Sequence, residues 1–154
     1  MEKLSPLQIE RLKYQPKLPS SLSEGINGLE MVEGSATQSV RDQEQIKELF
    51  RNTYGKPVVT FKHTSSSSAS EVRNVGVILS GGQAPGGHNV IAGLYDALKQ
   101  ANSANKLYGF LGGPSGIIEG NYVEFDDKFM DDYRNTGGFD IIGSGRTKLE
   151  TEEQ

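Results

Sequence analysis

The sequence predicts an α/β fold, in which a parallel β-sheet is flanked by helices and preceded by an extended N-terminal arm. Two observations lead to this prediction. From residue 72 onward, short apolar runs typical of strands alternate with apolar residues at helical spacing, as in βαβ units. Glycine supplies 19 of the 154 residues, and 15 of these glycines lie between Gly76 and Gly145. Glycine-rich turns therefore separate the expected strands and helices.

The composition excludes several classes of protein. The chain has 16 basic and 20 acidic side chains, a net charge of −4, which argues against a nucleic-acid binder driven by phosphate neutralisation. It has no cysteine, so disulfides, cysteine-ligated zinc and thiol catalysis are excluded. No signal-peptide core follows the first residues, and no apolar stretch approaches the roughly 18 residues of a membrane span. We therefore expect a cytoplasmic protein without a nucleic-acid or membrane partner.

Residues 1–70 are expected to form an N-terminal arm, a helix and a mobile serine-rich loop. Segment 1–36 contains prolines and scattered apolar residues without a sustained period, which indicates an extended arm. Apolar residues at helical spacing predict a helix over 39–52. A short apolar run predicts a strand over 58–61, and the low-complexity stretch Ser65–Ser70 predicts a mobile surface loop.

Residues 71–154 are expected to form the first part of an α/β domain. Near-continuous apolar runs are typical of strands buried on both faces of a parallel sheet, and a one-sided apolar pattern is typical of the helices between them. The expected elements are a strand over 75–79, a helix ending near Gln100, a strand over 107–111, a helix over 126–135 and a strand over 139–142. The last four residues, Thr151-Glu152-Glu153-Gln154, match a capping box. A helix is therefore expected to begin there, and the chain is interpreted as the N-terminal piece of a longer protein.

Three glycine-rich turns, 81–87, 112–116 and 143–145, follow expected strands. In open α/β sheets, ligands bind beyond the carboxyl ends of the strands. Glycine lets backbone N–H groups approach a ligand closely, and the first turn also precedes a helix whose N-terminus favours an anion. Phosphate is therefore the natural candidate ligand. The alternative is that these glycines only form tight turns; for 112–116, bordering a ligand site and shaping the turn stay equally open.

The known nucleotide-binding fingerprints are absent from the sequence. It contains neither the P-loop pattern nor G-x-G-x-x-G, so a P-loop or a Rossmann dinucleotide site is disfavoured. Arg146 and Lys148 add positive charge after the third turn, and a guanidinium fork suits phosphate oxygens. The prediction is a phosphate site built from glycine turns and a basic side chain.

Two further sets of residues are open to a functional and a structural interpretation. Four aspartates, Asp126, Asp127, Asp131 and Asp132, could suggest a metal cluster, but on a helix with apolar residues inward they are expected to form a solvated acidic face. His88 follows the first glycine turn and could take part in catalysis. We expect it instead to pack or to form hydrogen bonds at the start of the helix.

Four segments of the chain resemble the long pyrophosphate-dependent 6-phosphofructokinases. They are SPLQIERLKYQPKLPSSL (5–22), VGVILSGGQAPGGHNVIA (75–92), LYGFLGGPSGIIEGNYVEF (107–125) and YRNTGGFDIIGSGRTKLETEEQ (133–154). The resemblance covers nearly the whole chain apart from the Ser65–Ser70 region. It is specific, because GGQAPGGHNVI and TGGFDIIGSGRTK together are not generic phosphate-loop strings.

The resemblance implies a partial phosphofructokinase-type sheet and a glycolytic phosphotransferase. The activity would move a phosphoryl group from pyrophosphate to the 1-hydroxyl of fructose 6-phosphate with Mg²⁺, in a homo-oligomer, expected to be a dimer. The positions that match the family's donor-binding residues are Gly82 and Arg146, with Gly81 and Gly145 beside them. Gln83 stands where ATP-using relatives commonly have Asp, which favours the pyrophosphate type. The intact glycine loop favours a catalytic chain over the non-catalytic subunits that alter it.

The chain lacks two motifs that the family carries later in its sequence. These are a GGDDS-type motif, which helps to position Mg²⁺ and pyrophosphate, and a PKTIDGD-type motif, which holds the catalytic base. We therefore expect no catalytic residue and no metal ligand in this chain, a dependence on the remainder of the polypeptide, and no activity of the chain alone. An ATP-dependent 6-phosphofructokinase and a non-catalytic regulatory subunit of the same fold are the alternatives.

Overall fold

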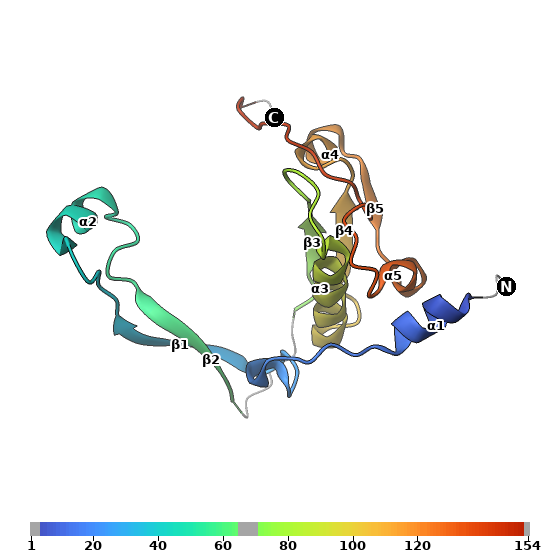
Figure 1. The fold of residues 1–154 in the computed structure, drawn as a ribbon, viewed down its shortest axis with the longest axis horizontal. Helices are drawn as coiled ribbons and strands as arrows, with labels where there is room; N and C mark the ends of the chain where they lie inside the picture. Colours follow the sequence, from blue (N-terminus) through green and yellow to red (C-terminus); the bar gives the residue numbers. More distant parts are fainter. Residues whose placement is uncertain (1–3, 65–70, 153–154) are drawn as a thin grey trace. The chain divides into compact units, whose positions relative to one another are not determined.

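A computed structural model describes residues 4–64 and 71–152 (Figure 1). The predicted loop over Ser65–Ser70 lies outside the described residues, as do Glu153 and Gln154 of the helix expected from Thr151. By their internal contacts, residues 18–68 form one compact unit, and residues 1–17 form a second unit together with residues 69–154. The division predicted at residue 70 stays a prediction as a domain boundary.

The 18–68 unit is an antiparallel β-hairpin with short helices. It contains the 3₁₀-helix η1 (Ser20–Leu22), strand β1 (Leu29–Ala36), helix α2 (Gln43–Leu49) and strand β2 (Pro57–His63). The pairing of β1 with β2 begins at Leu29 and His63 and is irregular between Glu33 and Ala36. The helix predicted within 39–52 and the strand predicted over 58–61 are confirmed. Strand β1 lies within the predicted arm and was not predicted, because its apolar residues do not alternate regularly.

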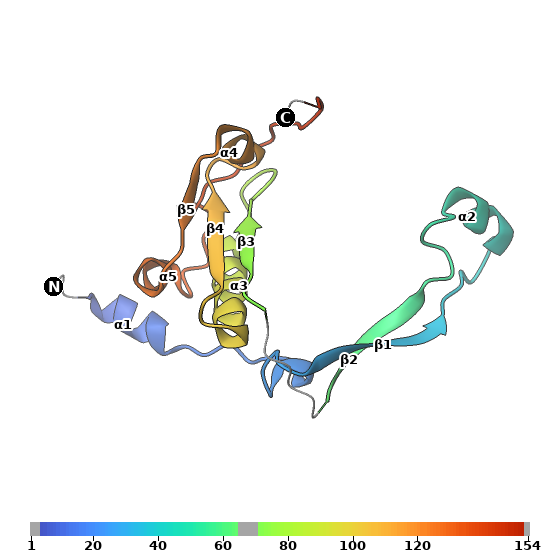
Figure 2. The same cartoon turned by 180° about the vertical axis from the view of Figure 1, so that it is seen from behind.

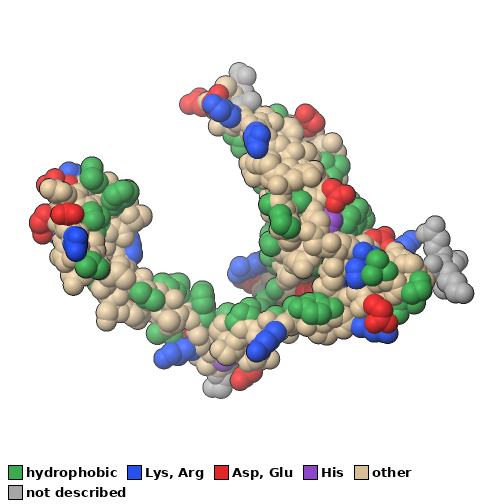
Figure 3. All heavy atoms as spheres, viewed as in Figure 1, with side chains coloured by type: hydrophobic (Ala, Val, Ile, Leu, Met, Phe, Trp, Pro, Cys, Tyr) green, Lys and Arg blue, Asp and Glu red, His purple; other side chains and the backbone are tan. Residues whose placement is uncertain are grey.

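The hairpin exposes apolar side chains and contributes no core. No described residue between 18 and 64 is buried. Met31 is 61% exposed and Phe61 is 53% exposed, and Figure 3 shows hydrophobic side chains along the surface of this unit. An isolated two-stranded hairpin is at best marginally stable in water.

The second unit carries a small mixed sheet with the order β3-β4-β5. Its strands are β3 (Asn74–Val77), β4 (Lys106–Phe110) and β5 (Tyr122–Glu124), and its helices are α1 (Pro6–Lys13), α3 (Gly87–Ala101), α4 (Pro114–Glu119) and α5 (Asp127–Tyr133). Strands β3 and β4 pair in parallel, whereas β4 and β5 pair antiparallel. The β3-α3-β4 segment is the predicted βαβ unit, so the α/β fold class is confirmed.

The strand predicted over 139–142 is wrong, and the sheet instead gains the unpredicted antiparallel strand β5. Ile141 and Ile142 are 5% and 3% exposed, so their apolar character reflects burial in the core rather than a place in the sheet. Further along the chain, Gly145 forms an isolated parallel bridge with Ser80, which follows β3.

The core lies between α3 and one face of the sheet. Figure 1 shows α3 in front of β3 and β4, and Figure 2 shows the opposite face without a helix in front of it. The buried apolar residues are Ile91, Ala92, Tyr95, Leu107, Phe125, Met130, Ile141 and Ile142. The open face carries Tyr108, Phe110 and Tyr122, whose rings make edge contacts at 5.4 and 5.8 Å. One face of the sheet is therefore open among the described residues, although the apolar runs of its strands are typical of strands buried on both faces.

Helix α1 turns part of the predicted arm into a docked element. Ser5 and Gln8 form a reciprocal capping box, a local signal that the predicted arm did not include. The amide of Asn135 donates to the carbonyls of Arg11 (2.7 Å) and Tyr14 (3.2 Å), which fixes the end of α1 beside α5. No helix in the described part of the chain is long and apolar enough to cross a membrane.

Candidate functional site

The three predicted glycine turns meet beyond the ends of β3 and β4. The N–H of Gly81 donates to the carbonyl of Gly145 (2.8 Å), and the N–H of Gly145 donates to the carbonyl of Leu79 (3.3 Å). The N–H of Gly112 donates to the carbonyl of Ile142 (2.9 Å). The third turn therefore lies between the first two, although the segment that leads into it is not a strand.

The second turn shapes this junction by its close backbone packing. A Cβ at Gly113 would come within 3.0 Å of the carbonyl oxygen of Leu79 and would also collide with the backbone N of Gly145. Gly113 is buried and has a φ of +79°, a conformation that residues with a side chain rarely adopt. The segment 112–116 therefore shapes the turn, and its place beside a ligand site stays a prediction.

Arg146 lies against the first turn. A Cβ at Gly82 would come within 2.9 Å of Nη2 of Arg146, so the absence of a side chain at Gly82 makes room for the guanidinium. Both residues are exposed, and no carboxylate of the described residues forms an ion pair with Arg146. An accessible guanidinium beside an exposed glycine backbone is suited to binding phosphate oxygens.

The start of α3 is partly closed by another loop. The N–H of Gly86 donates to the carbonyl of Gly137 (2.8 Å), and the N–H of His88 donates to the carbonyl of Gly138 (3.0 Å). Two amides at the helix start are therefore already used within the protein. The expectation that the helix N-terminus favours an anion stays a prediction, and exposed groups also lie at Gly82 and Arg146.

His88 has the structural role that the sequence favoured. Its side chain is 3% exposed. Nε2 accepts hydrogen bonds from the N–H groups of Asp140 (3.0 Å) and Ile141 (3.1 Å), and Nδ1 lies 2.6 Å from Oγ1 of Thr136. The imidazole is therefore buried and hydrogen-bonded at both nitrogens within the protein.

The four aspartates at the start and along α5 are exposed, as predicted for a solvated acidic face, and three of them have protein partners. Asp126 caps the helix by accepting from the N–H of Phe129 (2.7 Å), and Asp127 accepts from the hydroxyl of Tyr95 (2.8 Å). Burial first, and then the hydrogen bond to Asp127, raise the pKa of Tyr95 to about 12. Among the described residues, no group of three or more His, Asp or Glu side chains could hold a metal ion.

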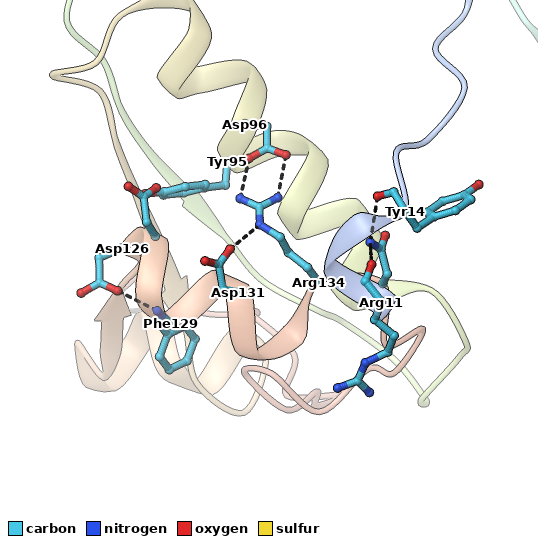
Figure 4. A network of polar contacts seen from close by, with 10 residues as sticks. Arg11, Tyr14, Tyr95, Asp96, Asp126, Phe129, Asp131 and Arg134 are labelled. Atoms are coloured by element: carbon cyan, nitrogen blue, oxygen red, sulfur yellow. Dashed lines mark hydrogen bonds and ion pairs between the residues drawn. The ribbon is translucent and has the colours of Figure 1, made fainter. Parts of the chain in front are cut away.

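Arg134 joins α5 to α3 through a fork that the sequence analysis did not predict (Figure 4). Nη1 and Nη2 each lie 2.7 Å from a carboxylate oxygen of Asp96, and Nε lies 2.8 Å from Oδ1 of Asp131. The hydrogen bond to Asp96 is the largest cause that holds the pKa of Arg134 above its ordinary value. No local sequence signal could reveal this pairing, because Arg134 and Asp96 lie on different helices.

Comparison with known proteins identifies homologues over nearly all of the chain. No protein-family model matches it. The chain is 52% identical to the pyrophosphate–fructose 6-phosphate 1-phosphotransferase of Porphyromonas gingivalis and 48% identical to that of Entamoeba histolytica, over 97% and 98% of the chain and 27% and 28% of those proteins. It is 41% identical to subunit beta 2 of this phosphotransferase from Arabidopsis thaliana, over 97% of the chain and 26% of that protein.

The chain is a homologue of part of these phosphotransferases. It spans about a quarter of the length of the pyrophosphate–fructose 6-phosphate 1-phosphotransferases that it matches. The predicted resemblance to pyrophosphate-dependent 6-phosphofructokinases is therefore confirmed. The names of these relatives give their own substrates, and the roles of Gly81, Gly82, Gly145 and Arg146 in this chain stay predictions.

Proposed function

We propose that this chain forms part of the phosphoryl-donor site of a cytoplasmic phosphotransferase that moves a phosphoryl group from pyrophosphate to the 1-hydroxyl of fructose 6-phosphate. The observation that carries the proposal is the position of Arg146 against Gly82, where three glycine turns meet. The names of the homologues, at 48–52% identity, support pyrophosphate and fructose 6-phosphate as the substrates.

The proposed roles follow from the chemistry of these residues. Pyrophosphate is a multiply charged anion, and the guanidinium of Arg146 can bind two of its oxygens at once. Gly82 leaves the space in which the guanidinium and a phosphate oxygen meet. Gly81 and Gly145 hold the two turns together through their 2.8 Å backbone hydrogen bond. In this proposal, the chain binds and orients the donor.

Mg²⁺ is proposed as the cofactor, because phosphoryl transfer depends on neutralising charge around the transferred group. The described residues do not themselves fit a Mg²⁺ site. Among the α5 carboxylates, Asp126, Asp127 and Asp131 are engaged by a backbone amide, a tyrosine hydroxyl and Arg134 respectively. The ligands would therefore come from the donor itself and from residues beyond this chain.

The catalytic base and the sugar-phosphate site are proposed to lie in the remainder of a longer polypeptide, within a homodimer. The relatives are about three and a half times as long as the chain, which leaves room for both. The exposed apolar side chains of the β1–β2 hairpin and of the open sheet face, such as Phe61 and Tyr122, provide surfaces that such contacts would cover.

The test is an assay of the complete polypeptide that carries this chain, with fructose 6-phosphate, Mg²⁺ and either pyrophosphate or ATP as the donor. The proposal predicts formation of fructose 1,6-bisphosphate with pyrophosphate, and none by the 154-residue chain alone. Turnover with ATP only would favour the ATP-dependent alternative. No turnover with either donor would favour a non-catalytic regulatory subunit.

A further inference from the structure

We propose that His88 is a positioning residue of the donor site, whose imidazole holds the segment 136–141 so that Arg146 lies against Gly82. The proposal rests on the function proposed above, because it assigns His88 a place in binding the phosphoryl donor. His88 touches neither the donor nor the acceptor. It acts through the backbone that carries Arg146.

The hydrogen bonds of His88 fix which ring nitrogen carries the proton. The backbone N–H groups of Asp140 (3.0 Å) and Ile141 (3.1 Å) can only donate, so Nε2 must accept and carries no proton. The proton of the neutral ring then lies on Nδ1 and is donated to Oγ1 of Thr136 at 2.6 Å. The Thr136 hydroxyl donates in turn to the carbonyl of Tyr133, also at 2.6 Å.

Nε2 of His88 also lies close to the carboxylate of Asp140. Oδ1 of Asp140 lies 2.9 Å from Nε2, which would be an ion pair only if Nε2 carried a proton. Such a proton would point toward the two amide N–H groups that already face this atom. The Asp140 side chain is 77% exposed and can turn into water, whereas the amides are fixed by the backbone. The hydrogen bonds from the two backbone N–H groups therefore determine that Nε2 carries no proton.

The ring is packed too closely for the segment to move independently of it. A Cβ at Gly138 would come within 2.5 Å of Cε1 of His88, and the ring of Tyr133 meets the imidazole edge-on at 5.0 Å between centroids. The N–H of His88 also donates to the carbonyl of Gly138 (3.0 Å). Side chain and backbone of His88 together fix the loop that follows α5.

This fixed segment leads directly into the candidate site. The N–H of Ile141 donates a hydrogen bond to Nε2 of His88. The carbonyl of the next residue, Ile142, accepts a hydrogen bond from the N–H of Gly112 in the second turn. Gly145 is then bonded to Gly81 in the first turn. Loss of the imidazole nitrogens would leave the buried N–H of Ile141 and the part-buried N–H of Asp140 without their acceptor, so this backbone would shift to recover hydrogen bonds elsewhere. Arg146 would shift with it.

The first test is His88→Phe in the complete polypeptide, a change that keeps an aromatic ring and removes both nitrogens. The KM for pyrophosphate should rise about ten- to a hundredfold, because small misplacements of a binding group have effects of this size. The KM for fructose 6-phosphate should stay within about twofold. Dissociation constants for inorganic pyrophosphate, measured by isothermal titration calorimetry, should change in parallel with its KM.

Conservative changes at Thr136 provide a second test that does not disturb the histidine. Thr136→Ser keeps the hydroxyl and should leave both Michaelis constants near the wild-type values. Thr136→Val keeps the shape and removes the acceptor for Nδ1, so it should raise the KM for pyrophosphate in the same direction as His88→Phe, by a smaller factor. Equal values for the serine and valine variants would contradict the proposal.

A double-mutant cycle separates positioning from a general loss of stability. If His88 acts through Arg146, adding His88→Phe to Arg146→Ala should change the KM for pyrophosphate by less than about twofold, because coupled residues are not additive. If the increases in the KM for pyrophosphate of the two single variants multiply in the double variant, the proposal is overturned. Met130→Ala, in the core, should lower the unfolding temperature while leaving the KM for pyrophosphate unchanged.

The outcomes for the wild type and for the variants report on different claims. Wild-type turnover with pyrophosphate, combined with an unchanged pyrophosphate KM in His88→Phe, overturns the role of His88 and leaves the proposed function standing. Wild-type turnover with ATP alone overturns the choice of donor, and the cycle is then measured on the KM for ATP. A wild type that binds neither donor overturns both proposals.

Discussion

Nη2 of Arg146 lies beside the position where a side chain at residue 82 would begin, since a Cβ on Gly82 would come within 2.9 Å of it. Gly82 belongs to the first glycine turn and Arg146 follows the third. Backbone hydrogen bonds between Gly81 and Gly145 and between Gly145 and Leu79 hold these two turns together. The absence of a side chain at one position thus determines where the charge at the other can lie.

Gly82→Ala tests this relationship with the smallest possible change. Gly82 does not need a positive φ, so alanine is compatible with its backbone, and the guanidinium of Arg146 would have to move instead. Moving a side chain away from its preferred rotamer costs about 1 kcal/mol. We expect the KM for pyrophosphate to rise about fivefold, with little change in the unfolding temperature.

Gly93→Ala is the matched control for the same substitution. Gly93 lies within α3, is exposed, and has no atom within 4 Å of a Cβ placed on it. Alanine should stabilise the helix by up to about 1 kcal/mol and leave the KM for pyrophosphate unchanged. A similar rise of this KM in both variants would contradict the specific role of Gly82.

Gly113→Ala should destabilise the protein rather than alter one substrate constant. The new Cβ would strike the backbone of Gly145 and Leu79. With a φ of +79° and a ψ of −144°, position 113 has a conformation that residues with a side chain rarely adopt, and keeping it would cost about 1–3 kcal/mol before any clash is counted. Differential scanning calorimetry should show a clearly lower unfolding temperature.

The comparison for that variant is Gly137→Ala. Gly137 has a φ of +71° but no atom within 4 Å of its Cβ position, so only the backbone strain remains. Its loss of stability should therefore be the smaller of the two. Equal losses for the two variants would show that close packing at Gly113 contributes nothing.

The sequence predicts the parts of the fold that rest on local patterns. The helix α3 and the strands β3 and β4 follow from apolar periodicity, and the glycine turns follow from composition. The prediction of a strand over 139–142 fails because burial of Ile141 and Ile142 produces the same apolar run as a strand does. Strand β5 is only three residues long, and only its central residue is partly buried. The sequence therefore contains no apolar pattern long enough to predict it.

The sequence predicts the residues of the candidate site, but it does not predict the polar contacts around them. Gly82 and Arg146 stand out by their motifs. The bond between His88 and Thr136 and the fork between Arg134 and Asp96 join residues far apart in sequence, so only the fold brings them together. In the proposal above, the pair of His88 and Thr136 holds the segment that leads to Arg146.

Stability should fall at alkaline pH because of Tyr95. Its pKa is raised from 10.0 to about 12, first by burial and then by its hydrogen bond to Asp127. The folded state therefore keeps a proton that the unfolded state loses, so this stabilisation is complete below pH 10 and is lost as the pH rises toward about 12.

The measurement compares the wild type with Tyr95→Phe. The free energy of unfolding of the wild type should decline more steeply with pH across this interval than that of the phenylalanine variant, which has no proton to lose. Parallel curves for the two proteins would contradict the raised pKa. Below pH 10 the variant should be the less stable protein, since it lacks the bond to Asp127.

The most direct test of donor binding at the glycine turns is the kinetics of Arg146→Ala in the complete polypeptide. Loss of hydrogen bonds from a charged donor costs about 1.5–3 kcal/mol, which corresponds to about a ten- to a hundredfold effect. We expect the KM for pyrophosphate to rise by such a factor while the KM for fructose 6-phosphate stays within about twofold. An unchanged KM and turnover number with pyrophosphate would contradict donor binding by Arg146.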